Sequence, residues 1–359
     1  MKTGRAPPPL FILPSSFSHE ASPGFRREGG LSGYVVGIDI GATWLRAVLA
    51  DGEGRFLLKK RERTEQSEEA LEAQLVQLVR ALLSETGVEE LDAIGVGAVG
   101  PIDIRAGAIV RPPNLPVERV EVARTLYEAF RTPIYVLNDC VAACYGEAFF
   151  GAGRGLSDLV FVGIGTGIGG GAIVDGHLLL GQSGNAVEIG HLVVDALGRM
   201  RCTCGAYGHW EAYCSGAGMP AFLRTWARER GLKERELEEA LGKKPSSITA
   251  KDILEACREE GRGLGDFLDE LVRFNAAGLA NIINAFNPAL ISIGGSVALG
   301  SFDIFIEPAL ALLPSYAFNE VPKIVQSPLG QDAGLYGAIA LALRPPDALV
   351  KRASYAKAG

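Results

Sequence analysis

Four potential metal ligands lie in one short stretch of the sequence, residues 188–211 (EIGHLVVDALGRMRCTCGAYGHWE). They are His191, Cys202, Cys204 and His209. Zn²⁺ prefers four nitrogen and sulfur ligands in a tetrahedral arrangement, and the glycines between these residues permit the tight turns that would bring them together. A loop with ordinary thiols and imidazoles is the simpler alternative. We favour a structural zinc site of the Cys₂His₂ type.

A first glycine turn, Asp39-Ile-Gly41-Ala-Thr43, joins two expected strands. A carboxylate, backbone N–H groups and a hydroxyl converge in such a turn, which suits Mg²⁺ and a terminal phosphate. The pattern D-x-G-x-T also occurs in hairpins without a ligand. Phosphate binding at this turn is therefore one of two interpretations that the motif leaves open.

A second glycine turn, Gly165-Thr166-Gly167, begins the run GTGIGG. The run matches the G-x-G-x-x-G pattern of dinucleotide sites, which requires a helix after the loop. Here residues 171–174 are typical of a strand. We therefore expect a hairpin whose backbone N–H groups bind phosphate oxygens, and not a Rossmann site.

Several polar side chains are placed where they could act on a substrate. Asn138 and Asp139 follow an apolar strand and precede a helix, so the carboxylate is either a helix cap or a general base for phosphoryl transfer. In the second case Asn138 would orient the substrate. Asn114, Glu188 and Glu211 lie in glycine-rich loops, where they could bind the hydroxyl groups of a sugar.

The elements that must position these residues follow from the apolar pattern. We expect strands at 34–39, 44–50, 56–64, 91–99, 134–137, 158–164, 171–175 and 289–293. We expect helices at 68–86, 120–130, 216–230, 235–241, 249–260, 263–286 and 333–343. Strands, helices and βαβ units in this order predict an α/β protein with mixed sheets flanked by helices. Two strand-turn-strand units, each with a glycine turn, further predict two similar domains that face each other across a cleft.

The length of 359 residues suggests two domains. We expect a smaller N-terminal domain formed by residues 34–138 plus 332–345, and a larger domain at 139–331 that contains the zinc loop. Residues 1–33, rich in Pro, Ser, Gly and Arg, are expected to be a disordered tail. Residues 346–359 are expected to be a flexible C-terminal tail.

Composition narrows the class of protein. The net charge of -7 and the lack of a Lys/Arg cluster argue against a nucleic-acid partner. No apolar run approaches the roughly 20 residues that a membrane span needs. The six cysteines do not form the framework of a small disulfide-rich domain, which favours a reducing cytoplasm.

Seven motifs in a fixed order carry a family resemblance. They are DIGAT at 39–43, GAVGP at 97–101, ND at 138–139, GIGTGIGGG at 163–171, EIGH at 188–191, CTCGAYGHWE at 202–211 and IGGS at 293–296. This chain resembles the ROK family of sugar kinases, members of the actin-like ATPase superfamily, from Tyr34 to Leu343. The E-x-G-H and C-x-C-G-x-x-G-x-x-E elements are the most distinctive.

The resemblance implies a role for each matching residue. Asp139 would be the catalytic base, and His191 would both contact the sugar and ligate zinc. The implied sugar contacts are Gly100, Asn114, Asn138, Asp139, Glu188, His191 and Glu211. The implied nucleotide contacts are Asp39, Gly41, Thr43, Gly165, Thr166, Gly167, Gly294, Gly295 and Ser296. The implied zinc ligands are His191, Cys202, Cys204 and His209.

The expected activity is ATP-dependent phosphorylation of a hexose 6-hydroxyl, with glucose the best candidate, Mg²⁺ and ATP as cofactors and a structural zinc ion. We expect a cytoplasmic homo-oligomer, such as a dimer, without a nucleic-acid or membrane partner. An N-acetylglucosamine or N-acetylmannosamine kinase is the nearest alternative. A sugar-responsive transcriptional regulator is less favoured, because no N-terminal DNA-binding domain is evident and Asp139 is retained. A non-catalytic sugar-binding protein is disfavoured by the two phosphate turns.

Four positions depart from the family pattern. His209 stands where the family usually has cysteine, and Val187 where it often has glycine. Val141 replaces a frequent asparagine, and Trp44 replaces the usual lysine or asparagine after the first turn. Histidine is an acceptable zinc ligand, so these changes bear on the preferred sugar more than on the reaction.

Overall fold

The computed structural model describes residues 33–259, 261 and 263–355, so our expectations for residues 1–32 and 356–359 lie outside it. The strands are β1 (Tyr34–Ile40), β2 (Trp44–Asp51), β3 (Phe56–Arg63), β4 (Ala93–Ala98), β5 (Ile102–Asp103), β6 (Ala108–Val110), β7 (Arg119–Val120), β8 (Ile134–Asn138), β9 (Leu159–Ile164), β10 (Ile168–Val174), β11 (His177–Leu178), β12 (Leu290–Gly294) and β13 (Lys323–Gln326).

The α-helices are α1 (Glu68–Thr86), α2 (Val122–Phe130), α3 (Asp139–Phe150), α4 (Glu211–Cys214), α5 (Gly218–Glu229), α6 (Glu234–Leu241), α7 (Ala250–Arg258), α8 (Gly265–Phe286), α9 (Ser296–Gly300), α10 (Phe302–Phe305), α11 (Glu307–Leu312), α12 (Ala333–Leu343) and α13 (Asp347–Val350). Short 3₁₀ helices occur at Ile189–His191, Leu313–Ser315 and Gly330–Asp332. None of the helices in the described part of the chain combines the length and the apolar content that a membrane span requires.

Two five-stranded sheets share one topology. The first has the order β3-β2-β1-β4-β8 and the second the order β11-β10-β9-β12-β13. In each sheet the first three strands are antiparallel neighbours and the last three are parallel neighbours. The predicted duplication and the predicted α/β class with mixed sheets are therefore confirmed. A third, small sheet of β5, β6 and β7 was not predicted, because its strands are only two or three residues long.

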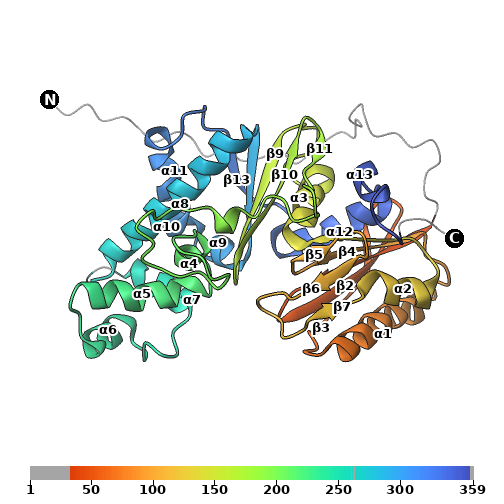
Figure 1. The fold of residues 1–359 in the computed structure, drawn as a ribbon, viewed down its shortest axis with the longest axis horizontal. Helices are drawn as coiled ribbons and strands as arrows, with labels where there is room; N and C mark the ends of the chain where they lie inside the picture. The colour runs from red at the N-terminus through yellow and green to blue at the C-terminus, as the bar shows by residue number, and fades with distance from the viewer. Residues whose placement is uncertain (1–32, 260, 262, 356–359) are drawn as a thin grey trace. The chain divides into compact units, whose positions relative to one another are not determined.

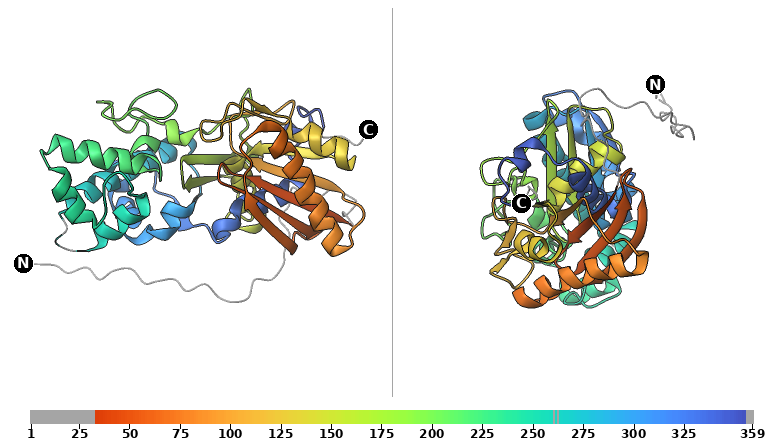
Figure 2. Two further views of the ribbon diagram at one scale, coloured as in Figure 1. Left: turned by 90° about the horizontal axis from the view of Figure 1, so that it is seen from below. Right: turned by 90° about the vertical axis from the view of Figure 1, so that its right-hand side faces the viewer.

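Helices cover both faces of the first sheet (Figures 1 and 2). α1 and α2 pack on one face, where Leu71, Leu75 and Leu78 of α1 are buried at the helical spacing that predicted this helix. α12 and α3 pack on the other face. The core beneath them includes Val48 of β2 and Phe161 of β9, so these two helices lie between the two sheets.

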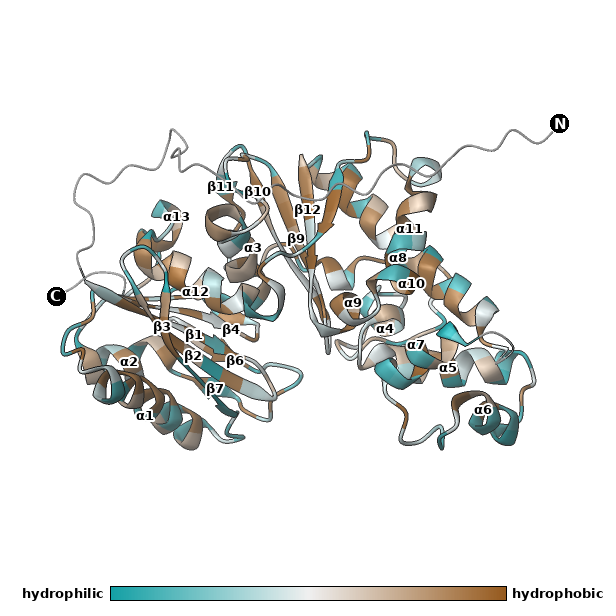
Figure 3. Ribbon diagram, turned by 180° about the vertical axis from the view of Figure 1, so that it is seen from behind, coloured by the Kyte–Doolittle hydropathy of each residue, from teal (hydrophilic) through white to brown (hydrophobic). Residues whose placement is uncertain are grey.

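The second sheet has its own core on the face away from α3. Strands β9 and β12 contribute apolar side chains that pack against α5, α7 and α8, and Figure 3 shows these strands as largely hydrophobic. Gly278 of α8 lies against the ring of Trp210, whose Nε1 donates to Asn275 Oδ1 at 2.9 Å. α8 ends at Phe286, as the sequence predicted, and its C-cap Asn287 has a left-handed φ of 44° before Pro288.

Strand β10 begins at Ile168, three residues earlier than predicted. Its glycine run was taken as part of the turn, but these glycines form the strand on which α3 packs. A Cβ on Gly169 would lie 2.7 Å from Cys140 Sγ, and one on Gly171 would lie 2.5 Å from Cys144 Cβ. The glycines are therefore needed for close approach of the helix and not for the turn. Strand β13 and helices α9 to α11 were also missed.

The C-terminal segment differs from the flexible tail that we expected at residues 346–359. Up to residue 355 it packs on the first sheet: α13 buries Leu349 completely, and the carbonyl of Tyr355 accepts a hydrogen bond from Ile134 N at 2.8 Å. Leu349 and Tyr355 are too far apart and too few to give a periodic signal, so the sequence alone could not reveal this docking.

Candidate active site

Asp139 is the first residue of α3, directly after strand β8. Asn138 is the N-cap of this helix, and its Oδ1 accepts hydrogen bonds from Cys140 N at 2.9 Å and Val141 N at 3.3 Å. The alternative that Asp139 serves as the cap is therefore wrong. Asp139 Oδ1 accepts the N–H of its neighbour Cys140 at 2.7 Å, and the Cys140 side chain also hydrogen-bonds to this carboxyl group.

The surroundings of Asp139 disfavour its charged form. Burial, the nearby carboxylate of Asp39 and the more distant Glu188 together raise the pKa of Asp139 to about 7, against the opposing effect of the Cys140 N–H. A carboxyl group with a pKa near neutrality is suited to accept a proton. This value is the strongest electrostatic sign of a reactive group in the site.

The first glycine turn is held by the end of strand β3. Gly41 N donates to Trp44 O at 3.0 Å, and Thr64 closes the turn through its N–H to Thr43 O and its hydroxyl to Gly41 O at 2.7 Å. Thr43 is exposed at the tip of the turn. A hydroxyl and backbone groups thus face solvent at the place where the sequence predicted phosphate.

Asp39 has a partner that the sequence did not indicate. Arg46 donates from Nε to Asp39 Oδ2 at 2.8 Å and also from Nη2 to the same oxygen. Burial nevertheless raises the pKa of Asp39, with Arg46 opposing the shift and Asp332 adding to it. Asp39 and Arg46 are register partners on adjacent strands, so only the strand pairing brings them together.

The second glycine turn is a tight hairpin that is held by hydrogen bonds from the residues before α5. Gly165 N donates to Gly167 O at 2.9 Å, and two N–H groups that precede α5 reach the turn: Gly216 N to Gly165 O at 2.8 Å and Ala217 N to Thr166 O at 3.0 Å. The predicted hairpin is thereby confirmed. The support from residues 215–218 has no motif of its own, and sequence reasoning missed it.

Gly294, Gly295 and Ser296, which the family resemblance assigned to nucleotide binding, lie next to this hairpin. A Cβ on Gly165 would lie 3.8 Å from Ser296 Oγ, and Gly295, at a φ of 88°, lies against the backbone of Ile164. The start of α9 and the second turn are therefore in contact, and Gly294 at the end of β12 directly precedes this contact in the chain.

Glu211 links the cysteine loop to the second turn. Its Oε2 accepts from Ile168 N at 2.8 Å, and its Oε1 lies 3.4 Å from the hydroxyl of Thr203. Asn114, Thr166 and Gly167 line the same cavity of about 80 Å³ together with Glu211 and Thr203. Residues that were assigned separately to sugar and to nucleotide thus share one enclosed space.

Glu188 directly precedes the 3₁₀ helix at Ile189–His191, and His191 is its last residue. Glu188 Oε2 is 4.0 Å from His191 Nε2, and burial raises the pKa of Glu188, with His191 opposing and Glu211 adding to the shift. The preceding Val187 has a φ of 65°. A β-branched residue rarely adopts this conformation, so a glycine at this position would remove backbone strain.

Gly100, in the loop after β4, lies close to Asn138 at the end of β8 and to Asn185 in the loop after β11. A Cβ on Gly100 would lie 3.1 Å from Asn138 Nδ2 and 3.9 Å from Asn185 Oδ1. Asn185 exchanges two hydrogen bonds with Ile102, through Oδ1 at 2.8 Å and Nδ2 at 2.9 Å. This clamp was missed, because a single asparagine in a glycine-rich loop carries no distinctive pattern.

The four predicted zinc ligands form one cluster. Their ligand atoms all lie within 4.8 Å of one another, with Cys202 Sγ 3.7 Å from His191 Nδ1 and Cys204 Sγ 3.3 Å from His209 Nδ1. Zn–N and Zn–S bonds of about 2.0 and 2.3 Å place tetrahedral ligands about 3.3–3.8 Å apart. The donor set therefore suits a zinc ion, and these two ligand pairs lie within that range.

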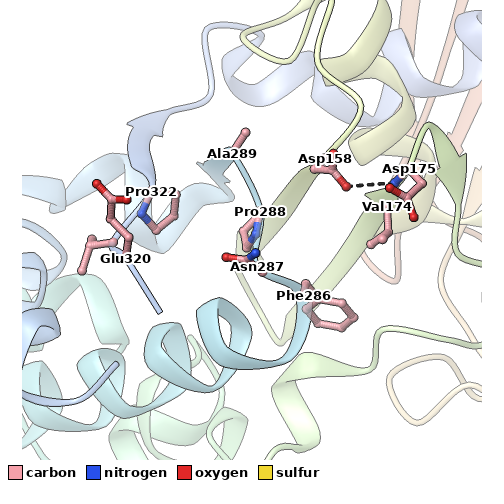
Figure 4. Close-up of a pocket in the computed structure, with 10 residues that line it drawn as sticks. Asp158, Val174, Asp175, Phe286, Asn287, Pro288, Ala289, Glu320 and Pro322 are labelled. Atoms are coloured by element: carbon pink, nitrogen blue, oxygen red, sulfur yellow. Dashed lines mark hydrogen bonds between the residues drawn. The ribbon is translucent and has the colours of Figure 1, made fainter. Parts of the chain in front are cut away.

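A larger cavity of about 660 Å³ lies at the amino-terminal ends of strands β9, β12 and β13 of the second sheet (Figure 4). It is lined by Asp158, Ala289 and Pro322, which precede β9, β12 and β13. Ligands of parallel sheets bind beyond the carboxyl ends of the strands, where the second glycine turn lies. This cavity is therefore not part of the candidate site.

Two sheets of one topology, with a glycine turn in each and a half-buried carboxylate at the start of α3, define an actin-like ATPase fold. Residues 35–345, nearly the whole described chain, match the ROK family. The chain belongs to the ROK family.

Known relatives cover almost the full length of the match. A glucokinase of Pyrobaculum calidifontis is 37% identical over 316 residues, which are 88% of this chain and 97% of that protein. The ROK hexokinase of Thermus thermophilus has a TM-score of 0.71 at 30% identity and covers 85% of this chain and 97% of its own. The ROK glucokinase of Streptomyces griseus in complex with glucose and AMPPNP has a TM-score of 0.70 at 30% identity, covering 86% and 99%.

Proposed function

We propose that this protein is an ATP-dependent glucokinase, which transfers the γ-phosphate of ATP to the 6-hydroxyl of glucose. One observation carries the assignment of the site: Asp139, with a pKa of about 7, lies at the start of α3 between the first glycine turn and the Glu188 loop. The relatives named glucokinase, one of them solved with glucose and AMPPNP, support the choice of substrates.

The reaction follows from this placement. The ionised Asp139 takes the proton of the 6-hydroxyl while the sugar oxygen forms a bond to the γ-phosphorus. The bond from that phosphorus to the bridging oxygen of ADP breaks, and ADP leaves with the electron pair. The N–H groups of Gly41 and Gly165 are used within their own turns, so those of residues 42–43 and 166–167 would face the charge that develops on the phosphate oxygens.

The sugar would be held from two directions. Glu188, His191 and Glu211 would meet one end of the ring, and Asn114 and Asn138 the other. Asn138 uses its oxygen to cap α3, so its Nδ2 is the group available to donate to a sugar hydroxyl. A site built to pair a hydroxyl discriminates against analogues that lack it, because its own polar groups are then left unpaired.

Two metal ions complete the proposal. Mg²⁺ bound to the donor phosphates would lie beside Asp39 and would neutralise phosphate charge. Both hydrogen bonds that Arg46 donates to Asp39 go to Oδ2, which leaves Oδ1 toward α12, where a Cβ on Gly334 would lie 2.8 Å away. Zinc held by His191, Cys202, Cys204 and His209 would be structural, since it orders the loop that carries Glu188 and Glu211.

The domain boundaries remain part of the proposal. Residues 34–138 with 332–345 would form one domain and residues 139–331 the other, and closure between them would exclude water during transfer. We also propose that the protein acts as a homodimer, which sedimentation would test.

A coupled ADP-release assay tests the function. We expect kcat/KM to be highest for glucose among glucose, 2-deoxyglucose, mannose, fructose, N-acetylglucosamine and N-acetylmannosamine, because three acidic or imidazole groups and Val187 crowd one end of the pocket. Glu211→Gln keeps an oxygen for Ile168 N and should reduce the discrimination between glucose and 2-deoxyglucose. If N-acetylglucosamine were the best substrate, the hexosamine kinase alternative would replace this assignment.

A further inference from the structure

Two arginine side chains of edge strand β3 stack on one tryptophan. The Cζ atom of Arg61 lies 3.6 Å from the centroid of the Trp44 ring, and that of Arg63 lies 4.3 Å from it. A guanidinium within about 6 Å of an indole centroid is attracted to the ring. The ring therefore holds two like charges together at the edge of the first sheet.

Neither of these charges has an acidic partner in the described part of the chain. Within the residues that the structure describes, Arg61 and Arg63 form no salt bridge, and both are exposed. Two carboxylates near this face have other cationic partners: Asp39 binds Arg46, and Asp332 binds Lys59 at 2.8 Å. The two guanidinium groups are thus held close together against their mutual repulsion, with no carboxylate partner among the described residues.

The cationic pair lies on the face of the sheet that carries the candidate base. Arg61, Arg46, Asp39 and Gly97 are successive register partners across four strands, and a Cβ on Gly97 would lie 3.4 Å from the Cα of Asp139. With a strand spacing of about 4.8 Å, the row spans about 14 Å.

Arg63 is also tied to the first glycine turn. It is the register partner of Trp44, the residue that follows the turn. The next residue, Thr64, bonds the turn through Thr43 O and Gly41 O. The two guanidinium groups thus extend outward from the place where a phosphate would bind.

We propose that Trp44, Arg61 and Arg63 form an anion site for a linear chain of phosphate groups whose inner end lies at the first glycine turn. A guanidinium group can bind two oxygens of one phosphate at the same time. Two guanidinium groups on one ring would therefore bind two successive phosphates. The stacking holds both side chains in place before the ligand arrives, which lowers the entropic cost of binding. Only the position of the inner phosphate rests on the proposed function.

The test is calorimetric titration of inorganic tripolyphosphate into the full-length protein, without sugar or nucleotide. Arg61→Gln/Arg63→Gln should weaken binding at least about tenfold, since both substitutions remove charge-assisted hydrogen bonds to phosphate. Trp44→Leu keeps both charges but removes the ring, and should weaken binding by a smaller factor. Added salt should lower the affinity of the wild type more than that of the double variant.

The matched control is Lys60→Gln, which removes the same charge from the opposite face of the same strand. Lys60 pairs with Glu85 there and points away from Trp44, so this variant should bind tripolyphosphate as the wild type does. The single variants Arg61→Gln and Arg63→Gln serve if the double variant does not fold, as judged by its melting curve.

Tripolyphosphate binding that is absent in the wild type, or equal in the wild type and the arginine variants, would overturn the proposal. An equal loss in Lys60→Gln would do the same, because it would show a general charge effect. The titration does not depend on catalysis. A protein that binds tripolyphosphate through this site but does not phosphorylate glucose would therefore refute the proposed function and leave this site standing.

Discussion

The carboxyl group of Asp139 is held at the start of α3 in a setting that opposes its ionisation. Burial and the Asp39 carboxylate raise its pKa, and hydrogen bonds from the backbone N–H and the side chain of Cys140 oppose the shift. The same features that make it a good proton acceptor near neutral pH also make its charged form costly to the fold. Activity and stability should therefore depend on pH in opposite directions.

Asp139→Asn tests this residue directly. The amide can still accept from Cys140 N, so folding and glucose binding should persist. Turnover should fall by a factor of about 10² or more, since the general base is lost. Steady-state kinetics and equilibrium glucose binding check both parts, and a purified variant with near-normal turnover would refute the role of Asp139 as the base.

The pH dependence of rate and of melting temperature provides a second test of Asp139. The wild-type rate should rise with pH through the pKa of about 7, because only the ionised form accepts a proton. The raised pKa means that this group stabilises the fold below its unfolded pKa of 3.8 and loses that contribution as pH rises through 7. Asp139→Asn should therefore melt higher than the wild type at pH 8, with a smaller difference at pH 5. A difference in melting temperature that does not change with pH would contradict this.

At the level of elements, the close packing of α12 on α3 positions the start of both helices beside the site. A Cβ on Gly337 of α12 would lie 2.1 Å from the carbonyl oxygen of Ala142 in α3. Backbone atoms cannot move aside as a flexible side chain can, so the two helices would have to separate.

Gly337→Ala should accordingly lower the free energy of unfolding by about 1–3 kcal/mol, as overpacking does. Gly265→Ala at the start of α8 is the matched control, because a Cβ there would meet nothing within 4 Å. The control should be neutral or more stable by up to about 1 kcal/mol, since alanine favours a helix. Denaturant titration of both variants measures their free energies of unfolding. Equal changes in the two variants would show that the contact between α12 and α3 does not cause the loss.

The loop from His191 to His209 should depend on its metal. The ligand atoms are close enough for one ion, so metal analysis should find about one zinc per chain. His209→Ala should lower zinc content and melting temperature together. His177→Ala removes an exposed histidine outside the cluster and should change neither. Zinc-free protein with unchanged melting and activity would exclude the site.

At the level of the whole molecule, the two sheets repeat one topology and present their glycine turns from different parts of the chain. Our expectation for the N-terminal segment depends on sequence alone, since residues 1–32 lie outside the described part. The segment lacks apolar periodicity, so it should not bury enough surface to offset the entropy of ordering. Deletion of residues 1–30 should leave kcat, KM and melting temperature unchanged. A clear loss in any of them would show that the segment docks on the rest of the protein.

The sequence by itself determined those parts of the protein that depend on neighbours along the chain. Alternating apolar residues and glycine turns predicted the strands around residues 41–43 and 165–167, and α1 has the bounds that its periodicity indicated. The metal ligands lie within one loop, so their spacing was sufficient to predict the cluster. Short strands such as β13 and the small third sheet carry too little pattern to be predicted.

Contacts between residues far apart in the chain were decided only by the tertiary structure. The clamp of Asn185 on Ile102, the bond from Ile168 N to Glu211 and the pairing of Arg46 with Asp39 each require a particular strand register or loop position. The pKa of Asp139 is of the same kind, because burial and the field of Asp39 arise only when the chain has folded. Residue types along a sequence indicate which chemistry is available. Which groups lose their water and which charges become neighbours depends on packing.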